Sequence, residues 1–191
     1  HHGNDCRNRR LLPPYHQMSP TLAEEIHKQS PFEEPTQEAY LNIVRTCTVL
    51  QADFDRLLKK HGLSHSTYNA LRILRGATVG PDAPGRRACN EIGEHLVSRV
   101  PDVTRLVDRL ESLGLAERVR DQGDRRIVFV KVTRKGIALL AKLDEPVLAL
   151  HRSQLRHMSA DQLAQLNRLL VAAREHAGRN EPSDAATGPV E

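Results

Sequence analysis

The sequence predicts a mainly α-helical protein with one small β-hairpin, and three observations support this fold class. Apolar residues recur at helical 3/4 spacing over most of the chain, as in Ile43, Val44 and Cys47. Two short strand-like runs, 115–120 and 127–132, flank the turn residues Asp-Gln-Gly-Asp. Residues that commonly cap helices stand ahead of several apolar stretches.

The N-terminal half is predicted to contain three helices. A proline in the first turn predicts a short helix over 20–29. Thr36 is expected to cap a long helix that ends before Gly62, and Ser64 is expected to begin the third helix. The Gly- and Pro-rich segment 76–88 is predicted to be a loop.

The C-terminal half is predicted to begin with two shorter helices, over 89–97 and 100–113, followed by the hairpin. Thr133 is expected to cap a long helix, which Pro146 should kink or split because proline removes a backbone hydrogen bond. Ser159 matches the start of an S-x-x-Q capping box ahead of a last helix. Two short helices separated by a turn and followed by a hairpin are the order of a winged helix-turn-helix.

Positive charge is concentrated in the middle of the chain. The 191 residues carry a net charge of +4, with a pI near 9.2. Segment 86–135 holds twelve Lys or Arg against eight Asp or Glu, so it carries the whole surplus. A localised basic surface favours a polyanion partner, although charge alone fits a solvated face equally well.

Several protein classes are excluded by what the sequence lacks. It has no apolar run of 18 residues and no signal-like apolar segment, so neither a membrane span nor secretion is expected. Its three cysteines are too scattered for a disulfide framework, and a cytoplasmic location is expected. It has no nucleophile elbow, P-loop, dinucleotide glycine pattern or H-E-x-x-H. We therefore expect no enzymatic activity, no catalytic residues and no cofactor.

The helix predicted over 100–113 has an apolar face and a mixed polar face. Arg105, Asp108 and Thr104 fall on or near the outward side, and these residue types can read base edges in a major groove. Asp108 has an alternative role, which is to hold Arg105 or Arg109 in position. An ordinary amphipathic helix with a charged exposed face explains the same pattern.

The hairpin offers a second DNA-contacting element. Arg125 and Arg126 stand at its tip, where a thin wing can place an arginine in a narrow minor groove. Asp121 and Asp124 lie close by, and a neighbouring carboxylate can orient a guanidinium through paired hydrogen bonds.

Residues 103–136 read VTRLVDRLESLGLAERVRDQGDRRIVFVKVTRKG, and this segment resembles the MarR family of bacterial transcriptional regulators. The resemblance rests on the helix VTRLVDRLE, the Gly-Leu turn, the D-R-R of the wing, and the Thr-x-x-Gly that opens the next helix. Ala116 departs from the family, where a larger aliphatic residue is usual. The helix order of the family fits residues 36–177.

The resemblance implies a domain organisation. Residues 36–177 are expected to form a single domain, with a winged helix-turn-helix over 64–133 and dimerisation helices over 36–61 and 134–177. An N-terminal helix and linker precede it over 18–35. The expected outer segments are an added leader or disordered arm over 1–17 and a disordered tail over 178–191.

The resemblance also implies a ligand-responsive repressor that binds a pseudo-palindromic operator as a homodimer. The expected partners are double-stranded DNA, a second copy of the chain and a small aromatic or anionic effector. The expected DNA-binding residues combine family positions with nearby basic and polar residues, among which Arg86 and Arg87 are proposed phosphate contacts from charge and position. They are Arg86, Arg87, Ser98, Arg99, Pro101, Asp102, Thr104, Arg105, Asp108, Arg125 and Arg126, with Asp121 and Asp124 orienting the wing. The candidate effector-binding residues are Tyr40, Arg45, His65, Tyr68 and Arg72.

Two alternative functions remain open at this point, whereas a metal-binding function is not expected. Cys47 could sense oxidants, but its apolar neighbours favour a buried, inert thiol. The chain could instead be a protein-interaction module without DNA binding. His61 and His65 have a metal-like spacing, but Gly62 should break the helix that would align them, so no metal site is expected.

Overall fold

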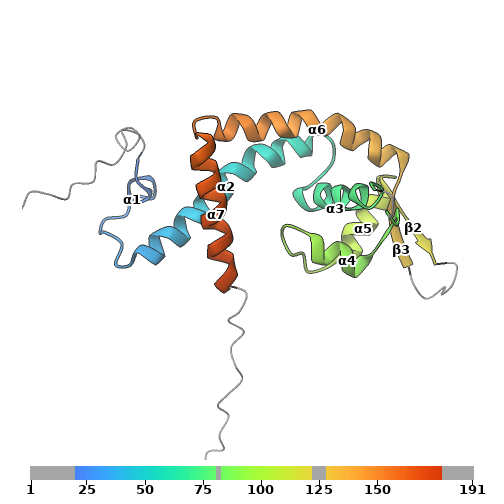
Figure 1. Cartoon of the computed structure of the whole chain (residues 1–191), viewed down its shortest axis with the longest axis horizontal. Coiled ribbons are helices and arrows are strands. Elements are labelled where there is room, and N and C mark those ends of the chain that lie inside the picture. The colour runs from blue at the N-terminus through green and yellow to red at the C-terminus, as the bar shows by residue number, and fades with distance from the viewer. Residues whose placement is uncertain (1–19, 81–82, 122–127, 178–191) are drawn as a thin grey trace, which may run out of the picture. The chain divides into compact units, whose positions relative to one another are not determined.

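A computed structural model describes residues 20–80, 83–121 and 128–177 of the chain, which form helices and one small antiparallel sheet (Figure 1). The chain divides into two compact units, the first ending at Asp53 and the second beginning at Phe54. No helix in the described ranges is both long and apolar enough to cross a lipid bilayer. The expected leader, the expected tail and the wing residues Asp124, Arg125 and Arg126 lie outside the described residues.

The first unit contains a short helix followed by most of a long one. Helix α1 spans Leu22–Glu25 and is shorter than the predicted 20–29, because His27 adopts a left-handed φ of +53° that ends the helical backbone. Helix α2 spans Pro35–Lys59 and begins one residue before the predicted cap Thr36. Proline suits a first helical position because its missing N–H would have no intrahelical partner there.

The predicted boundary between α2 and the next helix is confirmed. Gly62 has a φ of +70°, a conformation that glycine adopts without steric cost. Ser64 caps α3, which spans His65–Gly76. The backbone N–H of Thr67 donates to Ser64 Oγ at 3.2 Å, and the N–H of Ser64 donates to Thr67 Oγ1 at 2.8 Å. This reciprocal pair satisfies two donors at the helix start.

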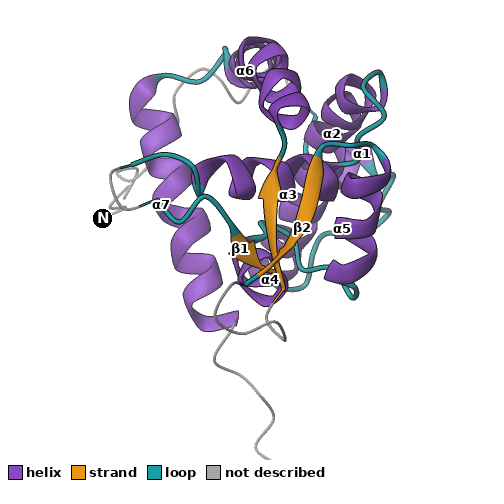
Figure 2. Cartoon of the chain, turned by 90° about the vertical axis from the view of Figure 1, so that its right-hand side faces the viewer, coloured by secondary structure: helices purple, strands orange, loops and turns teal. Residues whose placement is uncertain are grey.

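A three-stranded sheet and two short helices follow α3. The elements are β1 (Arg87–Ala88), α4 (Cys89–His95), α5 (Val103–Ser112), β2 (Ala116–Arg120) and β3 (Val128–Val132). The strands lie antiparallel in the order β1–β3–β2, beside α3, α4 and α5 (Figure 2). The sequence predicted a two-stranded hairpin and missed β1, because two residues are too few to show an alternating pattern.

Aliphatic side chains from the C-terminal end of α2, from α3, α4, α5, β2 and β3, and from residues 140–147 form one core in the second unit. Their close packing sets the position of α5 against the sheet and α3. The large side chains that are fully buried are Leu58, Leu71, Leu74, Ile92, Val107, Leu110, Val130, Leu140 and Leu143.

Two helices complete the described chain, α6 over Arg134–Leu155 and α7 over Ala160–Ala177. The hydroxyl of Thr133 accepts a hydrogen bond from the Gly136 N–H at 3.1 Å and caps α6 as predicted. Pro146 does not split this helix, because α6 is continuous through it, and a kink at Pro146 stays a prediction. The buried residues Leu143 and Val147 pack into the core on either side of the proline.

The capping box predicted at the start of α7 is confirmed. The N–H of Ser159 donates to Gln162 Oε1 at 2.8 Å, and the N–H of Gln162 donates to Ser159 Oγ at 3.3 Å. None of residues 160–175 is buried. Local cap chemistry therefore begins α7, whereas its apolar side chains have little packing within the described chain.

Candidate nucleic-acid interface

Helix α5 is held by its N-terminal cap and by its apolar face. The carboxylate of Asp102 accepts a hydrogen bond from the Arg105 N–H at 3.0 Å and caps the helix. Leu106, Val107 and Leu110 are buried against the core, as the predicted helix face required. Thr104, Arg105, Asp108, Arg109 and Ser112 are exposed, whereas Val103 and Glu111 are half-buried.

The C-terminal end of α5 is also held. Gly114 turns the chain out of the helix with a φ of +68°. Lys135 Nζ donates to the Leu113 carbonyl at 2.7 Å, and Thr133 Oγ1 donates to the Gly114 carbonyl at 2.8 Å. A cation at this end also interacts favourably with the helix dipole. The segment that opens α6 thus fixes the end of α5.

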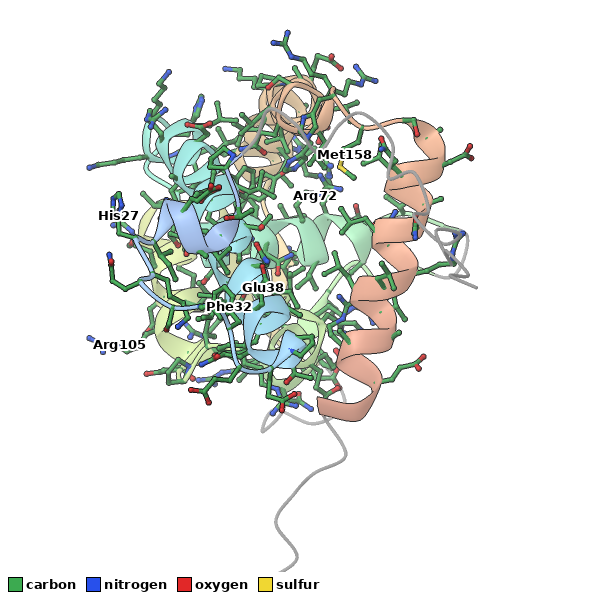
Figure 3. All side chains as sticks on the ribbon, turned by 90° about the vertical axis from the view of Figure 1, so that its left-hand side faces the viewer. His27, Phe32, Glu38, Arg72, Arg105 and Met158 are labelled. Carbon is green, nitrogen blue, oxygen red and sulfur yellow. The ribbon has the colours of Figure 1, made fainter. Side chains whose placement is uncertain are left out.

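The predicted DNA-binding residues of 98–108 lie in and just before α5 and are exposed, which suits contact with a large partner. Arg105 extends away from the ribbon into solvent (Figure 3), and its guanidinium has no partner among the described residues. The exposed set is Ser98, Arg99, Pro101, Asp102, Thr104, Arg105 and Asp108, whereas Arg86 and Arg87 are half-buried.

Asp108 does not hold Arg105 or Arg109, the alternative role considered for it. Its carboxylate instead pairs with the Arg118 guanidinium of β2 at 2.7 Å. This ion pair joins a residue of α5 to a residue of β2, so it is a tertiary contact. The spacing of residues within α5 alone does not predict it. The carboxylate of Asp108 is thus engaged within the protein, which counts against a role in base reading.

Arg118 is the centre of a network that joins β2 to α5. Its guanidinium also pairs with Glu111, its backbone N–H donates to Glu111 Oε1 at 2.8 Å, and its Nη2 donates to the Thr104 carbonyl at 3.4 Å. Partial burial by itself lowers the pKa of Arg118. Hydrogen bonds and charges from Asp108 and Glu111 outweigh that effect and raise the pKa above its ordinary value.

Arg86 and Asp121 form a second network at the base of the wing. Arg86 Nη2 lies 2.6 Å from Asp121 Oδ1, and its guanidinium stacks over the Phe129 ring at 4.1 Å from the centroid. Asp121 was predicted to orient the wing-tip arginines, and it forms an ion pair with Arg86. Arg86, predicted to contact phosphate, is therefore also engaged within the wing.

Sequence reasoning did not identify the contacts that Glu111, Arg118 and Lys135 make along α5 and at its C-terminal end. Glu111 and Arg118 have opposite charge and flank the turn at Gly114, which is the one sequence signal for their pairing. No comparable signal identifies Lys135, since its acceptor is a backbone carbonyl.

A pocket of about 470 Å³ lies in the second unit between α3 and α6. Arg72 Nη1 donates to the hydroxyl of buried Tyr68 at 3.2 Å and lies 3.8 Å from Asp144 Oδ1. The pocket is lined by Tyr68, Arg72, Asp144, Val147, Leu148 and His151.

Two of the five predicted effector residues, Tyr68 and Arg72, line this pocket. His65 lies close by, with its ring 5.1 Å from that of Phe54, which in turn contacts the Tyr68 ring at 5.5 Å. Tyr40 and Arg45 belong to the first unit. Tyr40 is exposed there, and Arg45 pairs with Glu25 at 3.2 Å.

The expectation that Cys47 is buried is wrong. Its thiol is exposed on α2, because the neighbouring apolar residues Ile43 and Val44 are themselves 45% exposed and form no core around it. Within the described ranges, no three His, Cys, Asp or Glu side chains come together in a way that would hold a metal ion.

Comparison with known proteins agrees with this geometry. The MarR family model matches residues 82–128. The HTH-type transcriptional repressor IacR of Pseudomonas putida is 25% identical over 118 residues, which are 62% of this chain and 66% of the repressor. A MarR transcription factor from Planctomyces limnophilus is 39% identical, with a TM-score of 0.55, over 74% of this chain and 99% of that one.

A third similar protein has a solved structure that contains nucleic acid. It is a mutant MarR from E. coli complexed with operator DNA, which is 26% identical with a TM-score of 0.58. The match covers 71% of this chain and 95% of that one. The fold, the exposed face of α5 and these likenesses show that the chain belongs to the MarR family and is a winged helix-turn-helix, DNA-binding transcriptional regulator rather than an enzyme.

Proposed function

We propose that the chain is a ligand-responsive repressor that binds its operator as a homodimer, with α5 in the major groove and the wing in the flanking minor groove. The observation that carries this proposal is α5 itself. Both of its ends are held, while Thr104 and Arg105 are exposed and the Arg105 guanidinium has no described partner. A rigid helix with a free arginine on its outer face suits reading of base edges.

The proposed contacts divide into base-reading and backbone-binding sets. Thr104 and Arg105 read bases, and Asp102 acts chiefly as the helix cap. The residues proposed to contact phosphates or the sugar backbone are Ser98, Arg99, Pro101 and Arg87. Arg125 and Arg126 are proposed to enter the minor groove.

Footprinting of the purified protein on genomic fragments tests the proposed docking. A two-fold symmetric dimer protects two related half-sites about one helical turn, roughly 10 bp, apart. Binding should weaken steeply as salt concentration rises, because phosphate neutralisation releases counterions. A single asymmetric half-site would contradict the dimeric arrangement, and binding that is insensitive to salt would favour an interaction module for another kind of partner.

The dimer proposal is supported by apolar side chains that the described chain leaves uncovered. Large exposed apolar residues usually mark a contact surface when several occur on the same elements. On α2 and α7 they are Tyr40, Ile43, Val44, Val49, Leu169 and Val171, each at least 45% exposed. Sedimentation of the wild type should give twice the chain mass, and the double change Leu169→Asp and Val171→Asp should give the monomer mass.

The effector proposal rests on the pocket between α3 and α6. Its volume of about 470 Å³ falls in the usual range for small-ligand sites. Val147 and Leu148 offer apolar contact, whereas Tyr68 and Arg72 offer a hydroxyl and a cation. We propose a small aromatic ligand with an acidic group, whose charge pairs with Arg72.

Titration with benzoate and with phenol tests this pocket. A bound ligand should release operator DNA and raise the thermal midpoint of the wild type, since it stabilises the folded chain. Arg72→Met should abolish the benzoate effect while operator affinity without ligand stays unchanged. Equal responses of the wild type and Arg72→Met would show that the ligand binds elsewhere.

A thiol-sensing function is a second candidate, and the exposure of Cys47 is the observation that favours it. Peroxide should then release operator DNA from the wild type and leave Cys47→Ser bound. If both proteins release DNA equally, Cys47 is not the sensor.

A further inference from the structure

We propose that Arg118 is a positioning residue for operator recognition, which sets the orientation of α5 relative to the wing without touching DNA. The proposal rests on the docking of α5 in the major groove described above. It concerns which residue makes that docking selective for one sequence.

The geometry of the Arg118 contacts supports this role. Thr104, Asp108 and Glu111 follow one another at spacings of four and three residues, so they form one stripe along α5. Arg118 contacts all three, through the Thr104 carbonyl and both carboxylates. One side chain of the sheet is therefore attached to successive turns of the recognition helix.

This attachment lies on the flank of α5 rather than on its outer face. At about 100° per residue, the stripe stands between the buried side, represented by Val107, and the outward side, represented by Arg105. The Arg118 side chain is only 28% exposed, and Glu111 is 31% exposed. The network is thus placed to control the helix while leaving the Arg105 side chain free, and it engages Thr104 only through its backbone carbonyl.

Arginine is well suited to this position. Its planar guanidinium presents several fixed donors and can serve Asp108 and Glu111 together, whereas a lysine ammonium has no such fork. The Arg118 backbone N–H adds a contact to Glu111 that does not depend on the side chain. Replacement of Arg118 by lysine should therefore loosen the helix without separating it from the strand.

A looser α5 should affect specific and non-specific binding differently. Recognition groups must be held within about 0.5 Å of their productive positions, so small shifts weaken base contacts. Phosphate contacts carry little sequence information and tolerate such shifts better. Loss of Arg118 should therefore reduce the preference for the operator more than the affinity for unrelated DNA.

The experiment compares wild type, Arg118→Lys and Arg118→Met on the footprinted operator and on an unrelated duplex, each over a series of salt concentrations. Operator affinity should fall about tenfold, the scale of one lost base-reading contact. Affinity for unrelated DNA should change less than about twofold, and the salt slope should be unchanged because no phosphate contact is lost. Lys131→Met is the matched control, since Lys131 forms an exposed pair with Glu117 on the same sheet.

A second set of variants keeps the test decisive if Arg118→Met fails to fold. The double variant Asp108→Asn and Glu111→Gln removes both charges from the helix side and should reproduce the loss of operator preference. Where all variants fold, adding Arg118→Lys to this double variant should cause little further loss of operator preference. The reason is that the three side chains act as one unit.

Three outcomes would overturn the proposal. The first is that the Arg118 variants and the double variant Asp108→Asn and Glu111→Gln fold and still prefer the operator over unrelated DNA as strongly as the wild type does. The network then does not position α5. Parallel losses on both DNAs with a salt slope reduced by about one would make Arg118 a phosphate contact. If the wild type itself shows no preferred site, the docking proposal fails, and the positioning role fails with it.

Discussion

The carboxylate of Asp144 on α6 accepts two hydrogen bonds from the Arg75 guanidinium on α3, at 2.7 and 2.8 Å. The two residues are 69 positions apart in the sequence, so the pair ties a helix of the DNA-binding fold to a long C-terminal helix. The same carboxylate lies 3.8 Å from Arg72 in the candidate effector pocket. Asp144 therefore connects that pocket with the attachment of α6 to α3.

Asp144→Asn should lower the free energy of unfolding by about 0.5–1 kcal/mol at neutral pH, a modest value because the Asp144 side chain is 45% exposed and screened by solvent. The hydrogen bond from Arg75 lowers the pKa of Asp144 below its ordinary 3.8. The contribution of the Arg75–Asp144 pair to the free energy of unfolding is therefore fully present above pH 3.8. It is lost as the pH falls through the lowered pKa of Asp144. Urea unfolding at several pH values should show the difference between wild type and variant shrinking on acidification, while Glu145→Gln at the exposed Arg152 pair changes little.

Gly136→Ala should destabilise the fold by about 1–3 kcal/mol, as expected for overpacking. A methyl group at Gly136 would collide with the Leu115 carbonyl oxygen and approach Val132 Cγ2 to 2.7 Å. Gly76→Ala is the matched control, because nothing lies within 4 Å of the position its methyl group would take. Thermal unfolding should give a clearly lower midpoint for Gly136→Ala than for Gly76→Ala. Equal midpoints would show that the first turn of α6 moves to accommodate the methyl group without a loss of stability.

The parts of this structure that could be predicted depend on local chemistry. Ser64, Thr133 and Ser159 begin helices as expected, because a cap satisfies backbone donors within three residues of itself. The apolar face of α5 was also predictable from local sequence. Helical periodicity places Val107 and Leu110 on the same side of the helix.

The parts that could not be predicted depend on contacts between distant segments. The strand β1 exists because Arg87 pairs with Val130, and nothing in two residues indicates that partner. Asp108 pairs with Arg118 across an element boundary rather than with Arg105 along its own helix. Periodicity placed Cys47 on an apolar stripe, but a stripe does not show whether the chain itself covers it.

Asp102→Ala should lower the free energy of unfolding by about 1 kcal/mol, because it removes the carboxylate that caps α5. Asp102→Ser should retain most of that stability, since a serine hydroxyl can accept the same hydrogen bond from Arg105. If capping is the main role of Asp102, the serine variant should also keep operator affinity in a filter-binding assay. A changed base preference in Asp102→Ser would instead show that the carboxylate reads a base.

Arg105→Ala should weaken operator binding by about 1–3 kcal/mol and relax the preference at one base position, because arginine on the outer face of α5 can pair with a guanine edge. The fold should be unaffected, since the Arg105 side chain is exposed and the backbone contact to Asp102 remains. Arg152→Ala removes the same charge from an exposed position on α6 and serves as the control. Selection from a randomised operator library distinguishes the two kinds of contact: a lost guanine preference supports base reading, whereas a uniform loss across all sequences with a smaller salt slope would assign Arg105 to the phosphate backbone.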